Sequence, residues 1–496
     1  MSVATTMARG GGERRGASLA RNAKSPRTLP PAATAGVAAV LGAIGALTLV
    51  VAPTSGPVLT LAFVMLPLVS WWFVTRDVTT ALVFTTIGEM YSGNSGTWLS
   101  IGPLSIRWLL IFTTIAVNML IRMWIPRPAS RKRIASRSGH ALPVLFFGAL
   151  FPIVLYAIAM VGTENSSTAA FKSVGFLLVL LFYFPLRRAL QANPQQLVAF
   201  LIGLSITLAL LMLSMSIGPM AFREEIISSI IGDQTVGYTM TGIARIMPVH
   251  IVLMFFPVFV FIFEMSMEKG RYRKIAYFGA ALFFMLPMVV TFLTGTLISM
   301  LIMLLLTGGF LTVNNVSRPH GKLIVSAAAV LAASTFYSAT VLTPDLLELK
   351  LVSRISGLTS GGGIDPSRDF QLLNFAEDFQ NHLWFGQGAG ATMDRATGGP
   401  QDRVEMEGLM IFHRYGLLGC VVFLAGFVAF AVQPIGLLRK RKSFDSAMAM
   451  ALAFWATVCT IVMAGMMNPF LTTPFPALFV GLYLVWDERV LSRSSG

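Results

Sequence analysis

Residues that could perform chemistry gather in one polar region of the sequence, between positions 365 and 414. Arg368 begins a stretch with helical periodicity and falls on the same side as the apolar residues Leu372 and Phe379. An arginine on an apolar face is costly unless it meets an anion, and phosphate is the anion available at the depth of lipid headgroups. The alternative is an arginine that extends to water and only anchors the helix.

Three spaced glycines follow this stretch, in Phe385-Gly386-Gln387-Gly388-Ala389-Gly390. A helix needs one glycine to end, whereas three favour a loop without bulky side chains, which another backbone or a substrate can approach closely. No strand precedes the glycines, so the pattern is not that of a dinucleotide-binding motif. We therefore predict that Gly386, Gly388 and Gly390 form a substrate loop.

Proton-transfer candidates lie where the next apolar run begins, in "DRVEMEGLMIFHRYGLLG" from 402 to 419. Glu405 and Glu407 precede the run, and His413 lies inside it. A carboxylate or imidazole that is half-buried can have its pKa moved toward neutrality and act as a general base. The alternatives are solvated loop carboxylates and a histidine that is hydrogen-bonded within a helix bundle.

A second arginine, Arg245 in "TMTGIARIMPVH", precedes another apolar run, in which Pro248 begins or kinks the helix. It is a second candidate ligand for an anion, or an anchor at the rim of the membrane.

The elements that must position these residues are membrane helices. The 496 residues are 55% hydrophobic and only 12% charged, with a mean hydropathy of +0.73, which is more apolar length than a water-soluble core can bury. The sequence predicts an all-α, polytopic integral membrane protein with about fourteen transmembrane helices. We place them near 35–52, 57–75, 78–92, 104–125, 141–161, 172–187, 196–217, 246–264, 275–293, 296–312, 322–342, 408–432, 446–466 and 470–487.

The distribution of charge orients these helices. With both termini in the cytoplasm, most of the 37 basic residues fall in cytoplasmic loops, and most of the 22 acidic residues fall at or beyond the outer surface. The predicted organisation follows from this topology. It comprises a disordered basic tail (1–34), eleven helices (35–342), an extracytoplasmic loop domain with amphipathic helices (343–407), three helices (408–487) and a cytoplasmic tail (488–496).

Several classes of function are disfavoured. The net charge of +15 indicates positive-inside loops in a membrane protein, so we expect no nucleic-acid partner. Cys420 and Cys459 both lie in apolar runs and predict neither a disulfide nor a thiol site. The five histidines have no metal-ligand spacing, and we expect no metal and no cofactor.

These motifs together resemble the superfamily of O-antigen ligases and O-antigen (exopolysaccharide) polymerases, which are bacterial integral membrane proteins. The resemblance lies in an arginine that opens a helix in a long outer loop (Arg368), in "HLWFGQGAG", and in "VEMEGLMIFHRYGLLG", with the Arg245 region as the other outer arginine segment. It covers about 60 residues and the topology. Trp384 stands where the family usually has proline. Glu405 stands where the ligases have a catalytic histidine, which looks more like a polymerase.

The resemblance implies a metal-independent glycosyltransferase of the bacterial inner membrane. Its donor would be an oligosaccharide on undecaprenyl pyrophosphate, and its acceptor a glycan at the outer face. Arg368 and Arg245 would stabilise the pyrophosphate, Glu405 or failing it Glu407 or His413 would accept the proton, and the glycine loop would admit the sugar. Partners would be the lipid bilayer and, in such systems, a flippase and a chain-length regulator.

Three alternatives remain open. A ligase, or a transporter that flips a lipid-linked sugar, would share the topology. A transporter would be expected to carry ionisable residues deep in its spans, but Glu89, Arg107 and Glu264 all lie near the ends of predicted spans. A scaffold subunit without catalysis would explain the topology but not the Arg368 helix.

Overall fold

The computed structural model describes most of the predicted helices and part of the segment 343–407. The described residues are 33–34, 36–38, 57–92, 100–101, 104–124, 140–162, 167–192, 194–217, 237–238, 244–245, 249–290, 294–314, 318–342, 366–394, 400–401, 407–440, 444–466 and 470–494. The predictions for the basic tail 1–34 and for the first span, 35–52, fall almost entirely outside these residues.

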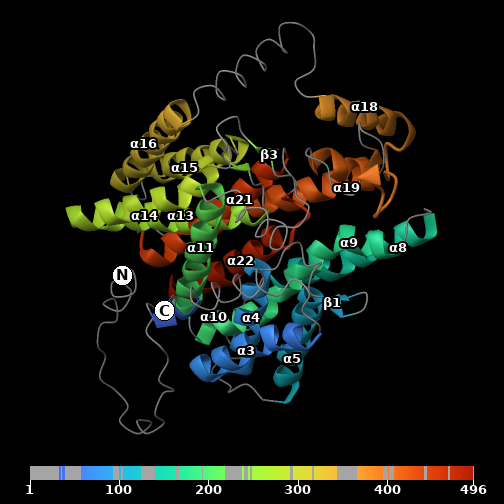
Figure 1. The fold of residues 1–496 in the computed structure, drawn as a ribbon, viewed down its shortest axis with the longest axis horizontal. Helices are drawn as coiled ribbons and strands as arrows, with labels where there is room; N and C mark the ends of the chain where they lie inside the picture. Colours follow the sequence, from blue (N-terminus) through green and yellow to red (C-terminus); the bar gives the residue numbers. More distant parts are fainter. Residues whose placement is uncertain are drawn as a thin grey trace, which may run out of the picture. The chain divides into compact units, whose positions relative to one another are not determined.

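The described elements of regular structure are helices, apart from three two-residue antiparallel pairs (Figure 1). These pairs are β1 (Ser100–Ile101) with β2 (Leu104–Ser105), β3 (Gly237–Tyr238) with β4 (Ala244–Arg245), and β5 (Met393–Asp394) with β6 (Pro400–Gln401). Within the described residues, seven helices are long and apolar enough to cross a membrane. The fold is therefore that of an α-helical membrane protein.

Each predicted span from 57 onward coincides with one helix or with a continuous run of helical segments. These are α3 (Pro57–Thr75), α4 (Val78–Ser92), α5 (Ile106–Trp124), α7 (Ala141–Leu145) with η1 (Phe146–Leu150) and α8 (Phe151–Gly162), α9 (Ser167–Leu178) with η2 (Val179–Phe182) and α10 (Tyr183–Ala192), α11 (Pro194–Ile217), η4 (Val249–Met254) with α13 (Phe255–Met267), α14 (Arg271–Val290), α15 (Thr294–Val313), α16 (Arg318–Leu342), α19 (Glu407–Ala431), α21 (Ser446–Gly465) and α22 (Pro474–Ser494). Between α16 and α19 lies α18 (Pro366–Asn381), and α20 (Gln433–Lys440) follows α19.

By the density of its internal packing the chain divides into two units, Met1–Lys132 with Phe184–Thr235, and Arg133–Tyr183 with Val236–Gly496. In the first unit, Phe84 of α4 stacks on Phe200 of α11 at 4.5 Å between ring centroids, and Trp71 of α3 meets both rings edge-on. Asp77 begins α4 by accepting the amide of Thr80 at 2.9 Å, which satisfies one of the free amides of the first turn.

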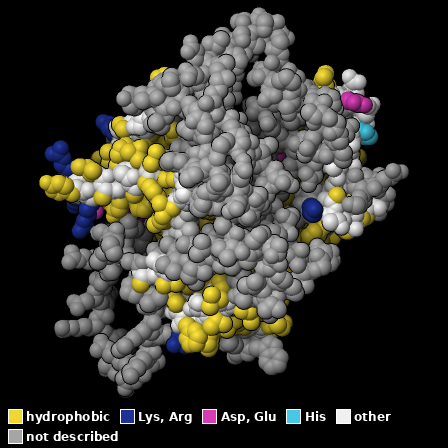
Figure 2. Space-filling view, in the orientation of Figure 1, with side chains coloured by type: hydrophobic (Ala, Val, Ile, Leu, Met, Phe, Trp, Pro, Cys, Tyr) yellow, Lys and Arg dark blue, Asp and Glu magenta, His cyan; other side chains and the backbone are white. Residues whose placement is uncertain are grey.

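In the second unit the most deeply buried helix is α21, which packs against α13, α15 and α22. The small alanine side chains of α21 allow these helices to approach closely. Phe454 of α21 stacks on Phe256 of α13, with ring centroids 4.6 Å apart. Asp445 caps α21 by accepting the amide of Met448 at 2.9 Å. Around this centre the outer helices present apolar side chains. Figure 2 shows hydrophobic side chains over the region where α14 lies in Figure 1, with lysine and arginine at its edge.

Candidate functional site

The glycine loop, defined here as residues 382–391, lies between α18 and β5 and packs against a break in α19. The break is at Gly416, where φ is 60° and ψ is −165°, a combination that L-residues with a side chain do not adopt without strain. α19 is therefore two helical segments, one before Gly416 and one after it, that meet at this residue.

The backbone of the glycine loop supplies the hydrogen-bond partners that the broken helix lacks. The amides of Gln387 and Gly388 donate to the carbonyls of His413 and Arg414 at 2.7 and 2.9 Å. In the other direction, the amides of Leu417 and Leu418 donate to the carbonyls of Leu383 and Trp384 at 2.8 and 3.2 Å. Helix ends leave carbonyls or amides without partners, and here one loop satisfies both ends at the same break.

Glycine is required on both sides of this contact. A Cβ atom on Gly386, whose φ is 66°, would lie 2.6 Å from the His413 carbonyl oxygen and from the Gly416 nitrogen. A Cβ atom on Gly416 would lie equally close to backbone, 2.6 Å from the nitrogen of Gly386. At these positions the glycines allow two stretches of backbone to touch.

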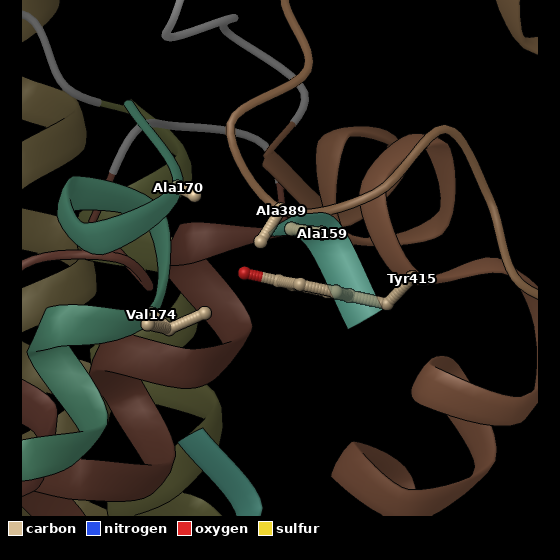
Figure 3. Packing of buried hydrophobic residues seen from close by; sticks show 5 residues of the cluster. All are labelled: Ala159, Ala170, Val174, Ala389 and Tyr415. Atoms are coloured by element: carbon tan, nitrogen blue, oxygen red, sulfur yellow. The ribbon is translucent and has the colours of Figure 1, made fainter. Parts of the chain in front are cut away.

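The far end of the glycine loop packs on α9. Gly388 and Gly390 are buried and have positive φ, and a Cβ atom on Gly390 would lie 2.7 Å from the nitrogen of Ala170. Figure 3 shows the side chain of Tyr415 reaching toward Ala389 and Ala170 in a small buried cluster. The Tyr415 hydroxyl donates to the Ser173 carbonyl at 2.9 Å. These glycines thus allow the backbone of the glycine loop to approach the backbones of α19 and α9 closely.

His413 and Arg414, on the last turn before the break, contact the end of the glycine loop and the residue that follows it. The Nε2 atom of His413 lies 3.3 Å from the carbonyl oxygen of Thr392, and Nε of Arg414 donates to the carbonyl of Ala391 at 3.0 Å. Both side chains are buried. The predicted proton acceptor His413 therefore has the environment of a hydrogen-bonded histidine inside a helix bundle.

Glu407, the first residue of α19, is buried and holds the turn before α22. One carboxylate oxygen, Oε1, accepts the amide of Thr472 at 2.9 Å and also the hydroxyl of that residue, and Oε2 accepts the amide of Leu471. A carboxylate surrounded by amide and hydroxyl donors is a strong structural anchor. These contacts join α19 to the connection between α21 and α22.

The remaining predicted residues are described only through their backbone or not at all. Arg368 lies in the first turn of α18, and Arg245 ends β4, where it pairs with Gly237 in the β3–β4 hairpin. Glu405 lies outside the described residues. The structure brings His413 and the three glycines together, and it places Glu407 at the other end of the same helical segment.

The sequence pattern did not single out Tyr415, Ser173 or the turn at 470–473 as parts of this region. Their contacts are made by backbone groups or span more than sixty positions of sequence, so no local spacing indicates them. The "YGLLG" motif was the available signal, because its first glycine is the helix break.

Elsewhere in the described residues, charged groups form ion pairs outside this region. Arg107 of α5 donates through Nε to Glu89 of α4 at 2.9 Å, and both side chains are buried. Within the described part of the chain, no group of three or more His, Cys, Asp or Glu residues could hold a metal ion.

No protein-family model matches the sequence, and no curated protein is significantly similar to it.

Proposed function

We propose that this protein is a polysaccharide polymerase of the bacterial inner membrane that transfers glycan repeat units from undecaprenyl pyrophosphate to an acceptor glycan. The observation that carries the proposal is the joining of its two motifs. "HLWFGQGAG" and "HRYGLLG" are separated in sequence, yet they are linked by four backbone hydrogen bonds across the break in α19. Each of the two motifs resembles the family pattern by itself, and their contact in one structural unit strengthens the proposal.

In the proposed reaction the acceptor hydroxyl oxygen attacks the anomeric carbon of the donor sugar. The bond from that carbon to the pyrophosphate oxygen breaks, the acceptor proton passes to a base, and undecaprenyl pyrophosphate leaves. Arg368 and Arg245 would offset the charge that develops on the leaving group, as fixed cations do in other transfer reactions. No redox step is involved.

Among the three candidate bases, Glu405 is the one that the contacts favour. Glu407 has both oxygens engaged by the turn before α22, and the His413 imidazole lies buried against Thr392. We therefore assign positioning roles to Glu407 and His413. Glu407 sets where α19 begins.

The test is complementation of a strain that lacks the gene with Arg368→Ala, Arg245→Ala and Glu405→Gln, each at equal levels in the membrane. We expect each variant to lose high-molecular-weight surface glycan while single lipid-linked repeat units accumulate at the outer face. Glu377→Gln, a substitution of an exposed carboxylate on α18, serves as the matched control and should restore full-length glycan.

The position of the accumulated material separates the alternatives. Repeat units trapped on the cytoplasmic face would indicate a flippase, and long polymer that stays on its lipid carrier would indicate a ligase. The ion pair Arg107–Glu89 gives little support to a transporter, because it joins the end of α4 to the start of α5. Full-length glycan in all three variants would refute the proposed site.

A further inference from the structure

The apolar face of α18 is only partly covered by protein. Phe375 and Phe379 pack against Phe412 of α19, with ring centroids 4.9 and 6.1 Å apart. On the same arc of the helix, however, Leu372 is 46% exposed and Phe379 is still 52% exposed. Burial of such side chains is favourable, so a face of this kind needs a further apolar partner.

The exposed face continues into the glycine loop through Trp384 and Phe385, which are 57% and 64% exposed. Together with Leu372 and Phe379 they form what we call the α18 patch. Polar residues border it, since Glu377 and His382 are exposed on the other side of the same segment. Figure 2 shows acidic and histidine side chains at the surface where α18 lies in Figure 1.

Two backbone hydrogen bonds hold the α18 patch beside the residues of α19 at which its exposed apolar surface begins. The carbonyls of Leu383 and Trp384 accept the amides of Leu417 and Leu418. Leu417 begins an exposed stripe, which continues through Val421, Leu424 and Val428. These positions follow the i, i+4, i+7, i+11 spacing of one helical face.

That stripe belongs to a helical segment long and apolar enough to span a membrane, residues Glu407–Arg439. In contrast, the turns of α19 before the break are largely buried in protein, including Met410 and Phe412. The lipid-facing surface of α19 therefore begins at the break, at the level of Trp384. The α18 patch is continuous with a surface that the bilayer covers.

From this continuity we propose that the α18 patch is inserted into the bilayer interface, with Trp384 at the boundary between headgroups and acyl chains. Tryptophan is enriched at this depth because its ring is apolar and its N–H is polar. The occupant of the patch is lipid, not a second copy of the chain or another protein. α18 then lies along the membrane surface as an amphipathic helix that is tied to a span by main-chain hydrogen bonds.

Insertion of the α18 patch does not depend on the proposed glycosyltransferase activity. If that activity is correct, however, insertion has a consequence for it. Position 368 falls on the same arc of α18 as 372 and 379, and a helix in the plane of the interface would hold this position at the depth of lipid phosphates.

The test uses the full-length chain in phospholipid nanodiscs, with Cys420→Ala and Cys459→Ala, and an environment-sensitive fluorophore on a single introduced cysteine. Reporter sites are Trp384→Cys and, as a second site that keeps the folded loop intact, Leu372→Cys. Leu424→Cys on the exposed stripe is the lipid-facing control, and Glu377→Cys is the water-facing control on the same helix.

We expect the 384 and 372 reporters to show blue-shifted emission, loss of emission with a spin label near the lipid headgroup, and protection from aqueous iodide. The 377 reporter should show the reverse. Quenching of the 384 and 372 reporters by iodide with no effect of the spin-labelled lipid would overturn the proposal. So would protection from both quenchers accompanied by disulfide cross-linking between two chains, because a second copy would then cover the patch. Either result leaves the glycan assay unaffected, so the two proposals fail separately.

Discussion

At the scale of single residues, Glu407 connects the start of α19 to the turn before α22 with one buried carboxylate. Replacing it by glutamine keeps the shape but turns an amide donor toward the amides of Leu471 and Thr472. Hydrogen bonds to a charged group contribute about 1.5–3 kcal/mol. We expect Glu407→Gln to lower the free energy of unfolding by about 1–3 kcal/mol, measured as a lower apparent melting temperature in nanodiscs. Glu377→Gln should leave the melting temperature unchanged, and an equal effect of both would contradict the anchoring role.

Glu268, which follows α13, gives a dependence on pH. The Gly270 amide is the largest cause of a lowered pKa for this carboxyl, and the amide of Lys269 and the charge of Arg273 act in the same direction. Because the folded state has the lower pKa, the stabilisation is present above the ordinary value of 4.5 and is lost as the pH falls below it. We expect Glu268→Gln to flatten the acid limb of a plot of melting temperature against pH. A limb identical to that of the wild type would contradict this contribution.

At the scale of elements, α15 and α16 pack through glycines. A Cβ atom on Gly308 would lie 2.8 Å from Cγ2 of Val325 and 2.9 Å from the Gly321 carbonyl oxygen. Its neighbour Gly309 has open space instead. Alanine is favoured over glycine in a helix by about 1 kcal/mol, whereas overpacking costs about 1–3 kcal/mol. We expect Gly308→Ala to lower the melting temperature and Gly309→Ala to maintain or raise it. The opposite order would show that the two helices do not pack through this face.

The helices were the part of the fold that the sequence predicted well, because long apolar runs have few alternatives in a membrane. The predicted spans 275–293 and 296–312 were separated only by Thr294 and Gly295, and in the structure these two residues are the first of α15. The amphipathic helix after Pro366 was also predicted correctly. The irregular turns within spans were not, because the π-helical η1 and the 3₁₀ segment η2 depend on packing between them, where Gly148 faces Leu180.

For the candidate site, local pattern indicated the residues but not their contacts. The glycines at 386 and 416 were visible in the sequence, yet the partner of each is the other, thirty positions away. The roles of Glu407 and Tyr415 depend on α22 and α9, which join this region only in the folded chain. Long-range contacts of this kind have no signature in the spacing of one sequence.

At the scale of the whole molecule, the predicted topology places 343–407 outside the cell and the connection between α13 and α14 inside. Phe370→Cys and Gly398→Cys, in a chain without Cys420 and Cys459, should react with an impermeant maleimide on intact cells. Tyr272→Cys, at an exposed position near the start of α14, should react only after the membrane is permeabilised. Labelling of the 272 site in intact cells would show that the orientation is the reverse of the predicted one.

The main-chain contact at the helix break has a consequence for mutational tolerance. Because the four hydrogen bonds between the glycine loop and α19 use backbone atoms, they do not depend on side-chain identity at Gln387, Leu417 or Leu418. They depend strictly on the absence of a side chain at Gly386 and Gly416. A saturation library scored for folded protein in the membrane should accept many residues at 387 and almost none at 386 or 416. Tolerance to substitution along this segment would then alternate abruptly between neighbouring positions, independently of their distance from any bound sugar.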